Sequence, residues 1–416
     1  MKILWVNFGG LLPLDMGGKI RSFHIVSELA KRHEVTLFTF YPRIEPDPHH
    51  GLRDPFARIE FLPPDLPEVA TPPDMLAYAA NALTARPYQI TRHCSASVRS
   101  RLRDLLQDES YDLVVCDFLL TAGAMPWPSP LPVVIFAHNV DAVIWRRRFL
   151  VDKRPLWRLV ALREWWTMAR AERHFGKLAD HVLTVSEEDR KDFVQYLPGD
   201  KVTAIPTGVD LEYFRPMQMD RQSDTLVFTG TMDWMPNEDA ILYFCSAVLP
   251  LIRERVPGVM LRVVGRQPSR RILALKDADS NIEVTGRVDD VRPYVCDAKV
   301  YVVPLRIGGG TRIKIFEAMA MGMPIVSTSI GAEGLPVEHG KNILLADTPA
   351  SFADATVTLL TQAAERQRIG SAARALVEER YGWPAVADVV DATLKRVAAA
   401  RCCASVQAPR LDFARR

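Results

Sequence analysis

Paired cysteines, long apolar runs and an excess of one charge are all missing from this sequence. Its six cysteines are scattered and no two stand at C-x-x-C spacing, which argues against a zinc site or a disulfide framework and favours a reducing cytoplasm. No uninterrupted run of ~18 apolar residues occurs, so no segment is expected to span a membrane. The net charge of the 416 residues is +2, and no nucleic-acid partner is expected from it.

The N-terminal segment MKILWVNFGG does not have the pattern of a signal peptide. Its apolar run is short, glycine and proline follow directly, and no small-residue cleavage site is present. We therefore expect a cytoplasmic protein, with a peripheral position at the inner face of the membrane left open.

Two common nucleotide-binding motifs are also absent. The segment DMGGKI contains Gly-Lys, but Ile20 follows it and Pro13 stands where a P-loop has its first glycine. The pattern G-x-G-x-x-G fails in GGGTRI because Ile313 occupies the last glycine position. Any nucleotide site must therefore rest on another pattern.

Short apolar runs separated by helical patterns are what the chain does have. The first series of expected strands is ILWVNF, EVTLFTF, YDLVVCDF, LPVVIFAHN and HVLTVS. A glycine-rich loop and the helical pattern KIRSFHIVSELAKR stand between the first two runs, which predicts a βαβ unit and a parallel sheet. The proline-rich stretch 41–87 gives no clear pattern.

A second series of expected strands begins near Asp224. It comprises TLVFTGT, MLRVVGR, NIEVTGR, KVYVVPL, MPIVSTS and NILLAD. We predict an α/β fold of two Rossmann-like, doubly wound parallel-sheet domains facing a central cleft, with ligands beyond the carboxyl ends of the strands. The first domain is expected over 1–205, with a helix over 385–405 packing back on it, and the second over 206–384.

The segment VYVVPLRIGGGTRIKIFEAMAMG is the most informative for function. An expected strand ends at Pro304, three glycines follow at 308–310, and a helix is predicted to begin near Arg312 and to end at Gly322. The first N–H groups of such a helix have no internal partner, and its dipole attracts an anion. Gly309, Gly310 and Thr311 would let a diphosphate approach the backbone, while Arg312 and Lys314 add positive charge without a metal.

Glu317 is expected about one turn further along this helix. A carboxylate there would repel a phosphate but could accept hydrogen bonds from a ribose cis-diol, so the pattern fits a nucleoside diphosphate. The alternative is a tight strand-to-helix turn with surface cations.

Several long segments resemble the retaining GT-B glycosyltransferases of family 4. They occur in the family's order over nearly the whole chain, and the variant resembles a subgroup found in bacterial exopolysaccharide and cell-surface glycan gene sets. FAHN resembles the strand end that carries the family's active-site histidine, His138 here. The other similar segments are GGKIRSFHIVSELAKRHEVTLFT, IPTGVDLEYFRP, VTGRVDDVRPYVCDAKVYVVPL and KIFEAMAMGMPIVST.

The resemblance implies an enzyme that moves a hexosyl group from a nucleoside-diphosphate sugar to a hydroxyl of a glycan or lipid-linked acceptor, with retention of configuration and without a cofactor or metal. It also shows two departures. The first of the family's two glutamates would fall at Gly309, and the usual Lys-Gly after the first strand of the second domain is replaced near Asn237. We expect Arg312 and Lys314, or another arginine such as Arg266, to supply the missing charge. A non-catalytic partner subunit of the same fold remains an alternative.

Further site residues are expected at the ends of predicted strands. His138 would contact the donor sugar or orient the acceptor hydroxyl, or it is a buried structural histidine. Gly17 and Gly18 open a helix and would face the phosphates or the acceptor, or simply form a turn. A set with weaker support would line the cleft floor or hold the base through backbone groups: Gly230, Arg287 and Val288.

The segment 145–173 is basic and rich in tryptophan. It holds nine lysines or arginines against three acidic residues, and four of the eight tryptophans of the chain. Cations with interfacial aromatic residues suit a peripheral contact with an anionic membrane. An ordinary helix with buried tryptophans and solvated arginines fits equally well.

Overall fold

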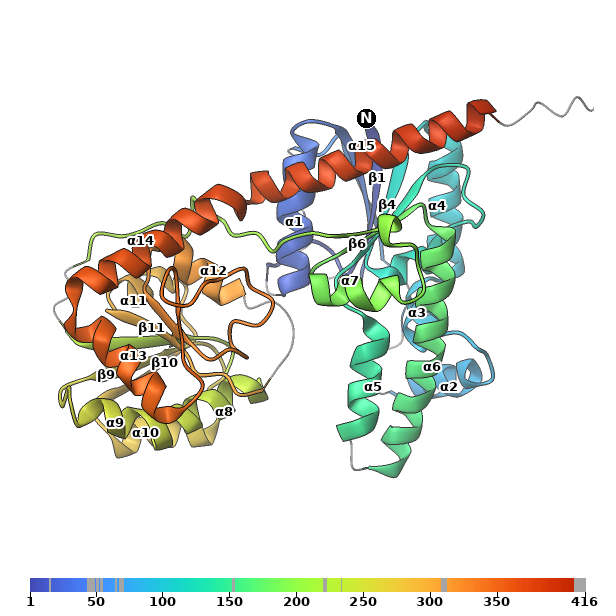
Figure 1. Cartoon of the computed structure of the whole chain (residues 1–416). Helices are drawn as coiled ribbons and strands as arrows, with labels where there is room; N and C mark the ends of the chain where they lie inside the picture. The colour runs from blue at the N-terminus through green and yellow to red at the C-terminus, as the bar shows by residue number, and fades with distance from the viewer. Residues whose placement is uncertain are drawn as a thin grey trace, which may run out of the picture. The chain divides into compact units, whose positions relative to one another are not determined.

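The protein consists of two compact units, Met1–Pro206 with Val386–Arg416, and Thr207–Ala385. Figure 1 shows the computed structural model, in which each unit is built on one sheet. We refer to them as unit 1 and unit 2. The structure describes residues 1–14, 16–42, 49, 52, 55–63, 66, 71–151, 154–219, 223–232, 234–307 and 313–407.

Unit 1 contains a seven-stranded sheet in the order β3-β2-β1-β4-β5-β6-β7, and every pairing is parallel. Apart from the edge strands β3 and β7, the strands are buried on both faces, which is why their sequences read as continuous apolar runs. Their bounds are β1 (Lys2–Phe8), β2 (Glu34–Phe40), β3 (Arg58–Leu62), β4 (Leu113–Asp117), β5 (Val133–Ala137), β6 (His181–Thr184) and β7 (Val202–Ala204).

Helices cover both faces of this sheet (Figure 1). The α-helices are α1 (Gly17–Ala30), α2 (Pro72–Ala82), α3 (Tyr88–His93), α4 (Ala96–Asp108), α5 (Asp141–Val151), α6 (Pro155–Leu178), α7 (Glu187–Val194) and most of α15 (Trp383–Gln407). Two short 3-10 helices are η1 (Leu119–Ala124) and η2 (Gly199–Lys201).

Unit 2 contains a six-stranded sheet in the order β10-β9-β8-β11-β12-β13, again parallel throughout. Its strands are β8 (Thr225–Thr229), β9 (Met260–Val264), β10 (Ile282–Gly286), β11 (Val300–Val303), β12 (Ile325–Ser327) and β13 (Leu344–Leu345). Its helices are α8 (Met235–Tyr243), the π-helix η3 (Phe244–Val248), α9 (Leu249–Arg253), α10 (Arg270–Ala278), α11 (Arg292–Cys296), α12 (Ile313–Ala320), α13 (Pro349–Thr361) and α14 (Ala363–Arg380).

The predicted fold of two doubly wound parallel-sheet domains is confirmed. Each of the eleven predicted apolar runs forms a strand, whereas β3 and β7 were not predicted. β3 lies within the proline-rich stretch 41–87 and is only half-buried at this sheet edge, so it lacks the apolar signature of the others. β7 has three residues, too few to show a periodic pattern of apolar side chains.

The last helix, α15, packs on unit 1. His33 Nε2 lies 2.8 Å from Asp391 Oδ1, and Arg401 Nη1 donates to Asp180 Oδ1 at 2.6 Å. Arg401 also donates to the carbonyl of Ser129. A helix from the end of the chain thus closes against the domain formed by its beginning. In the described part of the chain, every helix is too short or too polar to cross a bilayer.

Candidate active site

In unit 2, the candidate donor-site residues stand at the carboxyl ends of the two central strands. β8 and β11 pair directly, and Gly230 follows the end of β8. Helix α12 is the next helix after β11. Because all strands are parallel, these ends share one edge of the sheet, and the strand order reverses between them. This switch point is where open α/β sheets bind ligands.

Helix α12 is well defined at its C-terminal end. Gly322 adopts φ +67°, a left-handed conformation that glycine takes without strain. The N–H of Met323 donates to the carbonyl of Ala318 at 3.0 Å, which closes the helix in the manner of a Schellman motif. The predicted stop at Gly322 is therefore confirmed.

Lys314 reaches from α12 to the end of β8. Its Nζ donates to the carbonyl oxygen of Thr229 at 2.9 Å and to Asn237 Oδ1 at 3.0 Å, and it lies 4.0 Å from the centre of the Phe228 ring. The amide nitrogen of Asn237 in turn donates to the carbonyl of Thr231 at 2.9 Å. The cation is thus held at the carboxyl end of β8 by groups from two other segments.

Gly230 is confined by the same residues. A Cβ at this position would lie 2.8 Å from Asn237 Nδ2 and 3.1 Å from Lys314 Nζ. A larger residue would displace the lysine from the strand end. This close approach gives a physical reason for glycine here, in addition to its place at the switch point.

Glu317 lies one turn beyond Lys314 on α12. Its side chain is partly buried, and its carboxylate makes no hydrogen bond within the described part of the chain. Burial raises the pKa of this carboxyl to about 7, and the nearby Lys314 opposes that shift. A carboxylate of this kind is available to accept hydrogen bonds from a ligand.

The remaining donor-site candidates divide into two groups. Arg287 is exposed and Val288 partly buried, directly after β10 at the same sheet edge. They stand two strands away from β8 in the sheet order. Gly308, Gly309, Gly310, Thr311 and Arg312 lie outside the described residues, and their assigned roles stay predictions.

In unit 1, His138 belongs to a buried polar network at the carboxyl ends of β1, β4 and β5. Asp117 Oδ1 is 2.7 Å from His138 Nε2 and accepts from Ser22 Oγ at 2.9 Å. Its Oδ2 accepts from Asn7 Nδ2 at 2.7 Å and from Trp5 Nε1 at 3.0 Å. Asn7 and Asp117 are register partners on neighbouring strands, so the sheet itself brings them together.

This network determines the state of the histidine. Asp117 accepts hydrogen bonds from the other three partners, and we assign it the same acceptor role towards His138, which places the ring proton on Nε2. Burial lowers the pKa of His138, with Asp117 opposing the shift, so the ring is held towards the neutral form. His138 Nδ1 is then an acceptor, and it is buried without a hydrogen-bond partner in the described part of the chain.

Gly18, in the first turn of α1, packs against this histidine. A Cβ at Gly18 would lie 2.9 Å from Phe118 Cζ and 3.6 Å from His138 Nδ1. The Phe118 ring stacks on the His138 ring with centroids 4.1 Å apart, and Phe118 adopts φ +69°, a strained conformation for a bulky residue. Gly17 precedes this contact and is exposed.

Asp117, Ser22 and Phe118 were missed by the sequence reasoning. Asp117 did leave a signal, since a lone carboxylate inside the apolar run YDLVVCDF has to find a buried partner. Ser22 and Phe118 carry no such signal, because their role depends on contacts with a strand far away in sequence.

Two doubly wound parallel-sheet units of this topology define the GT-B class of fold. Solved structures agree with it. A sucrose-phosphate synthase from Thermosynechococcus elongatus superposes with a TM-score of 0.69 at 18% identity, covering 96% of this chain and 99% of the other. The Anabaena protein Alr3699/HepE, in complex with UDP and glucose, gives a TM-score of 0.64 at 16% identity, covering 95% and 99%.

Sequence comparisons give the family. The model of Glycosyltransferase Family 4 matches residues 17–213, and that of Glycosyl transferases group 1 matches residues 223–362. A GDP-mannose-dependent alpha-(1-6)-phosphatidylinositol monomannoside mannosyltransferase from Mycobacterium tuberculosis is 28% identical over 240 residues, which cover 52% of this chain and 61% of that protein. The chain is therefore a glycosyltransferase of the GT-B type. Relatives with transferase names do not favour a non-catalytic binding subunit.

Proposed function

We propose that the protein is a retaining glycosyltransferase that moves a sugar from a nucleoside-diphosphate sugar to a hydroxyl acceptor in the synthesis of a cell-surface polysaccharide or glycolipid. One observation carries the proposal: Lys314 and Glu317 project from one helix at the switch point of the unit 2 sheet, with the cation at the end of β8. A cation and an acid one helical turn apart match two neighbouring parts of a nucleoside diphosphate, the pyrophosphate and the ribose.

Each group has a defined part in donor binding. Lys314, with Arg312 and the N–H groups at the start of α12, would stabilise the negative charge that grows on the leaving diphosphate. Glu317 would accept hydrogen bonds from the ribose hydroxyls. Arg287 and Val288 would meet the base beyond β10. In this scheme side chains and backbone neutralise the diphosphate, and we propose no metal or cofactor in that role.

Names of similar proteins support the donor class. The HepE structures contain UDP, UDP-glucose, or UDP with glucose, and the mycobacterial relative is named as GDP-mannose-dependent. They differ in the base, so they support a nucleoside diphosphate sugar as a class. A 22% identical Klebsiella pneumoniae relative is named for the cps region, and the mycobacterial one for a phosphatidylinositol mannoside. These names support a surface glycan or a glycolipid as the acceptor class.

The reaction balances without a protein nucleophile. The bond between the anomeric carbon and the diphosphate oxygen breaks, and a bond to the acceptor oxygen forms on the same face. The acceptor proton passes to the leaving diphosphate oxygen. His138 would position a hydroxyl through its Nδ1 atom, and Asp117 would keep that atom free of a proton.

A panel of nucleotide sugars tests this proposal. Unfolding temperatures measured with UDP-, GDP-, ADP- and dTDP-sugars should rise for one base, because a ligand that binds only the folded state stabilises it. The chosen donor and a membrane extract as acceptor should then release nucleoside diphosphate, and NMR should show that the product keeps the donor's anomeric configuration. No shift with any donor and no release would contradict the proposal.

A further inference from the structure

Helix α6 exposes an apolar stripe. Leu156, Leu159, Leu162 and Trp166 have exposed fractions of 69, 65, 40 and 57%. Steps of three and four residues place them on one side of the helix, while Met168 and Ala171 are buried in the unit 1 core. In Figure 1, the paired helices α5 and α6 extend beyond the sheet of unit 1. Large apolar side chains that are exposed together in this way are typical of a surface that binds an apolar partner.

Helix α2 carries a second exposed apolar face. Met75 and Leu76 of the helix and its C-cap residue Leu83 are 66, 72 and 92% exposed, whereas the polar Asp74 and Asn81 are buried. The helix is therefore turned with its apolar residues outward. Such an arrangement is the reverse of the usual amphipathic surface helix of a soluble domain.

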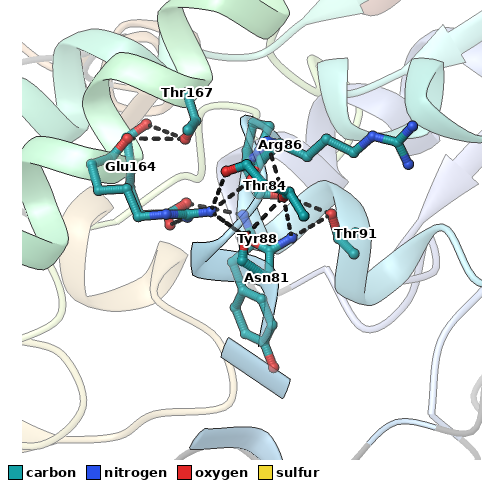
Figure 2. A network of polar contacts seen from close by, with 9 residues as sticks. Asn81, Thr84, Arg86, Tyr88, Thr91, Glu164 and Thr167 are labelled. Atoms are coloured by element: carbon teal, nitrogen blue, oxygen red, sulfur yellow. Dashed lines mark hydrogen bonds and ion pairs between the residues drawn. The ribbon is translucent and has the colours of Figure 1, made fainter. Parts of the chain in front are cut away.

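A polar network fixes these two helices together. Arg163 of α6 donates to the carbonyl oxygens of Asn81, Thr84 and Arg86 at 2.7, 3.1 and 3.2 Å. The neighbouring Glu164 accepts from the backbone N–H of Tyr88 at 3.1 Å. In Figure 2 the labelled residues of these segments, Asn81, Thr84, Arg86 and Tyr88, lie close together beside Glu164. Arg163 therefore holds the C-terminal end of α2 beside α6, and we treat the exposed apolar residues of α2 and α6 as one region of the protein surface.

Arginines border this surface. Five arginines are exposed: Arg146, Arg147 and Arg148 on α5, Arg154 directly before α6, and Arg158 on α6. Several lie on aromatic rings: Arg148 is 5.4 Å from the Trp145 ring and 5.7 Å from the Trp157 ring, and Arg158 is 5.1 Å from the Phe149 ring. Guanidinium groups on aromatic rings next to exposed leucines suit the interface of an anionic bilayer, where apolar side chains enter and cations meet phosphate.

We propose that α2, α5 and α6 form one composite docking surface for an anionic lipid bilayer. The positive border, set against lipid phosphate, favours a bilayer over a second copy of this chain, whose surface would present the same arginines. The surface also adjoins the site, because α5 begins three residues after His138. A lipid-linked acceptor would then arrive from the membrane. That acceptor assignment rests on the proposed function, whereas bilayer binding does not.

Flotation of the full chain with lipid vesicles, without donor or acceptor, tests the surface. Wild type should float with phosphatidylcholine vesicles that contain about 30% of the anionic lipid phosphatidylglycerol, because anionic lipid attracts basic segments. It should stay unbound with phosphatidylcholine alone. The triple variant Arg146→Gln, Arg147→Gln, Arg148→Gln should bind at least tenfold more weakly, since each cation near the surface contributes about fivefold. Equal binding to both vesicle types would overturn the proposal.

Two further variants test the apolar part. Leu159→Ser with Trp166→Ser, and separately Leu76→Ser with Leu83→Ser, should each reduce flotation about tenfold or more, because every residue changed is exposed and the fold should survive. Two control variants change exposed residues of unit 2 and should float like wild type. The control for the apolar variants is Leu273→Ser with Met217→Ser. The control for the arginine variant is Arg255→Gln with Lys276→Gln and Lys341→Gln.

Three outcomes would overturn the composite surface. The α2 variant could bind like wild type, the controls could bind as weakly as the test variants, or the protein could be a dimer in gel filtration that the same variants dissociate. Vesicle binding by a protein that fails to turn over any donor would leave this surface intact and contradict only the proposed function.

Discussion

Lys314 Nζ lies 2.9 Å from the carbonyl oxygen of Thr229, across 85 positions of sequence. The contact brings a cation from α12 to the end of β8, the place where family resemblance expects a Lys-Gly pair that this chain lacks. Asn237, which stands near that place instead, accepts a hydrogen bond from the lysine. We therefore interpret Lys314 as a replacement for the missing cation, supplied from a different helix.

Donor binding should depend on pH through Glu317. Its pKa of about 7 in the folded protein lies above the ordinary value of 4.5 because the carboxyl is buried. Ribose hydroxyls donate to the ionised form, so donor KM should fall by about tenfold or more between pH 5.5 and 8. A pH profile of kcat/KM measures this, and Glu317→Gln should flatten it. A profile identical in the variant would contradict the ribose role.

Ionisation of Glu317, which should improve donor binding as pH rises, should lower the stability of the protein without ligand. A raised carboxyl pKa favours folding below pH 4.5 and loses that contribution as pH rises through 7. Without ligand, Glu317→Gln should therefore be more stable than wild type at pH 8.5, by up to about 3 kcal/mol, and nearly equal at pH 5. Urea unfolding at the two pH values gives the comparison, and a variant less stable at pH 8.5 would contradict the buried-charge account.

Asp117 should control the tautomer of His138. Asp117→Asn presents an amide that can donate to the ring, so the proton on Nε2 is no longer required. We expect kcat to fall by about a hundredfold or more, by analogy with other orienting carboxylates, and the ¹⁵N shifts of the His138 ring to change. A loss of stability of about 1–3 kcal/mol should accompany this, because four hydrogen bonds converge on Asp117.

The ring shifts distinguish positioning from simple destabilisation. Ser22→Ala removes one hydrogen bond from the same carboxylate and the 3.2 Å contact of Ser22 Oγ with His138 Nε2, but it leaves Asp117 as the acceptor for His138. This control should lose some stability while keeping the Nε2–H tautomer and most of kcat. If Asp117→Asn kept wild-type ring shifts, the positioning role would be wrong.

Gly18→Ala should disturb the His138 pocket. The new Cβ would lie 2.9 Å from Phe118 Cζ, so the Phe118 ring must move off the histidine. We expect a loss of about 1–3 kcal/mol of stability, typical of overpacking, together with a fall in kcat. Phe118→Leu in the same chain should restore much of both. Gly258→Ala, with nothing within 4 Å of its Cβ, is the matched control and should be silent.

The fold was predictable from sequence to a large extent, for a physical reason. Strands of a parallel sheet are buried on both faces, so runs such as those at β4 and β5 stand out as uniformly apolar. The edge strand β3 is only half-buried and gave no such signal. Helix α2 was unpredictable for a related reason, because its apolar face points outward and its sequence lies within the proline-rich stretch 41–87.

The candidate site could be predicted only where its residues are close together in the sequence. The glycines, cations and acid around α12 are adjacent in sequence, so their pattern could be read directly. The partners of His138 come from β1, β4 and α1, and the contact of Lys314 with β8 depends on strand order. Such relationships arise only when the sheet assembles.

Calorimetric titration of a nucleoside diphosphate into wild type and Lys314→Met is the most direct test of the account. Methionine keeps the length of the side chain and removes the charge, and Lys276→Met, an exposed lysine of the same unit, is the control. We predict one site in wild type and in the control, and a Kd raised about 10- to 100-fold in Lys314→Met, since a hydrogen bond to a charged group contributes about 1.5–3 kcal/mol. A Kd unchanged in Lys314→Met, with both proteins folded, would contradict the account.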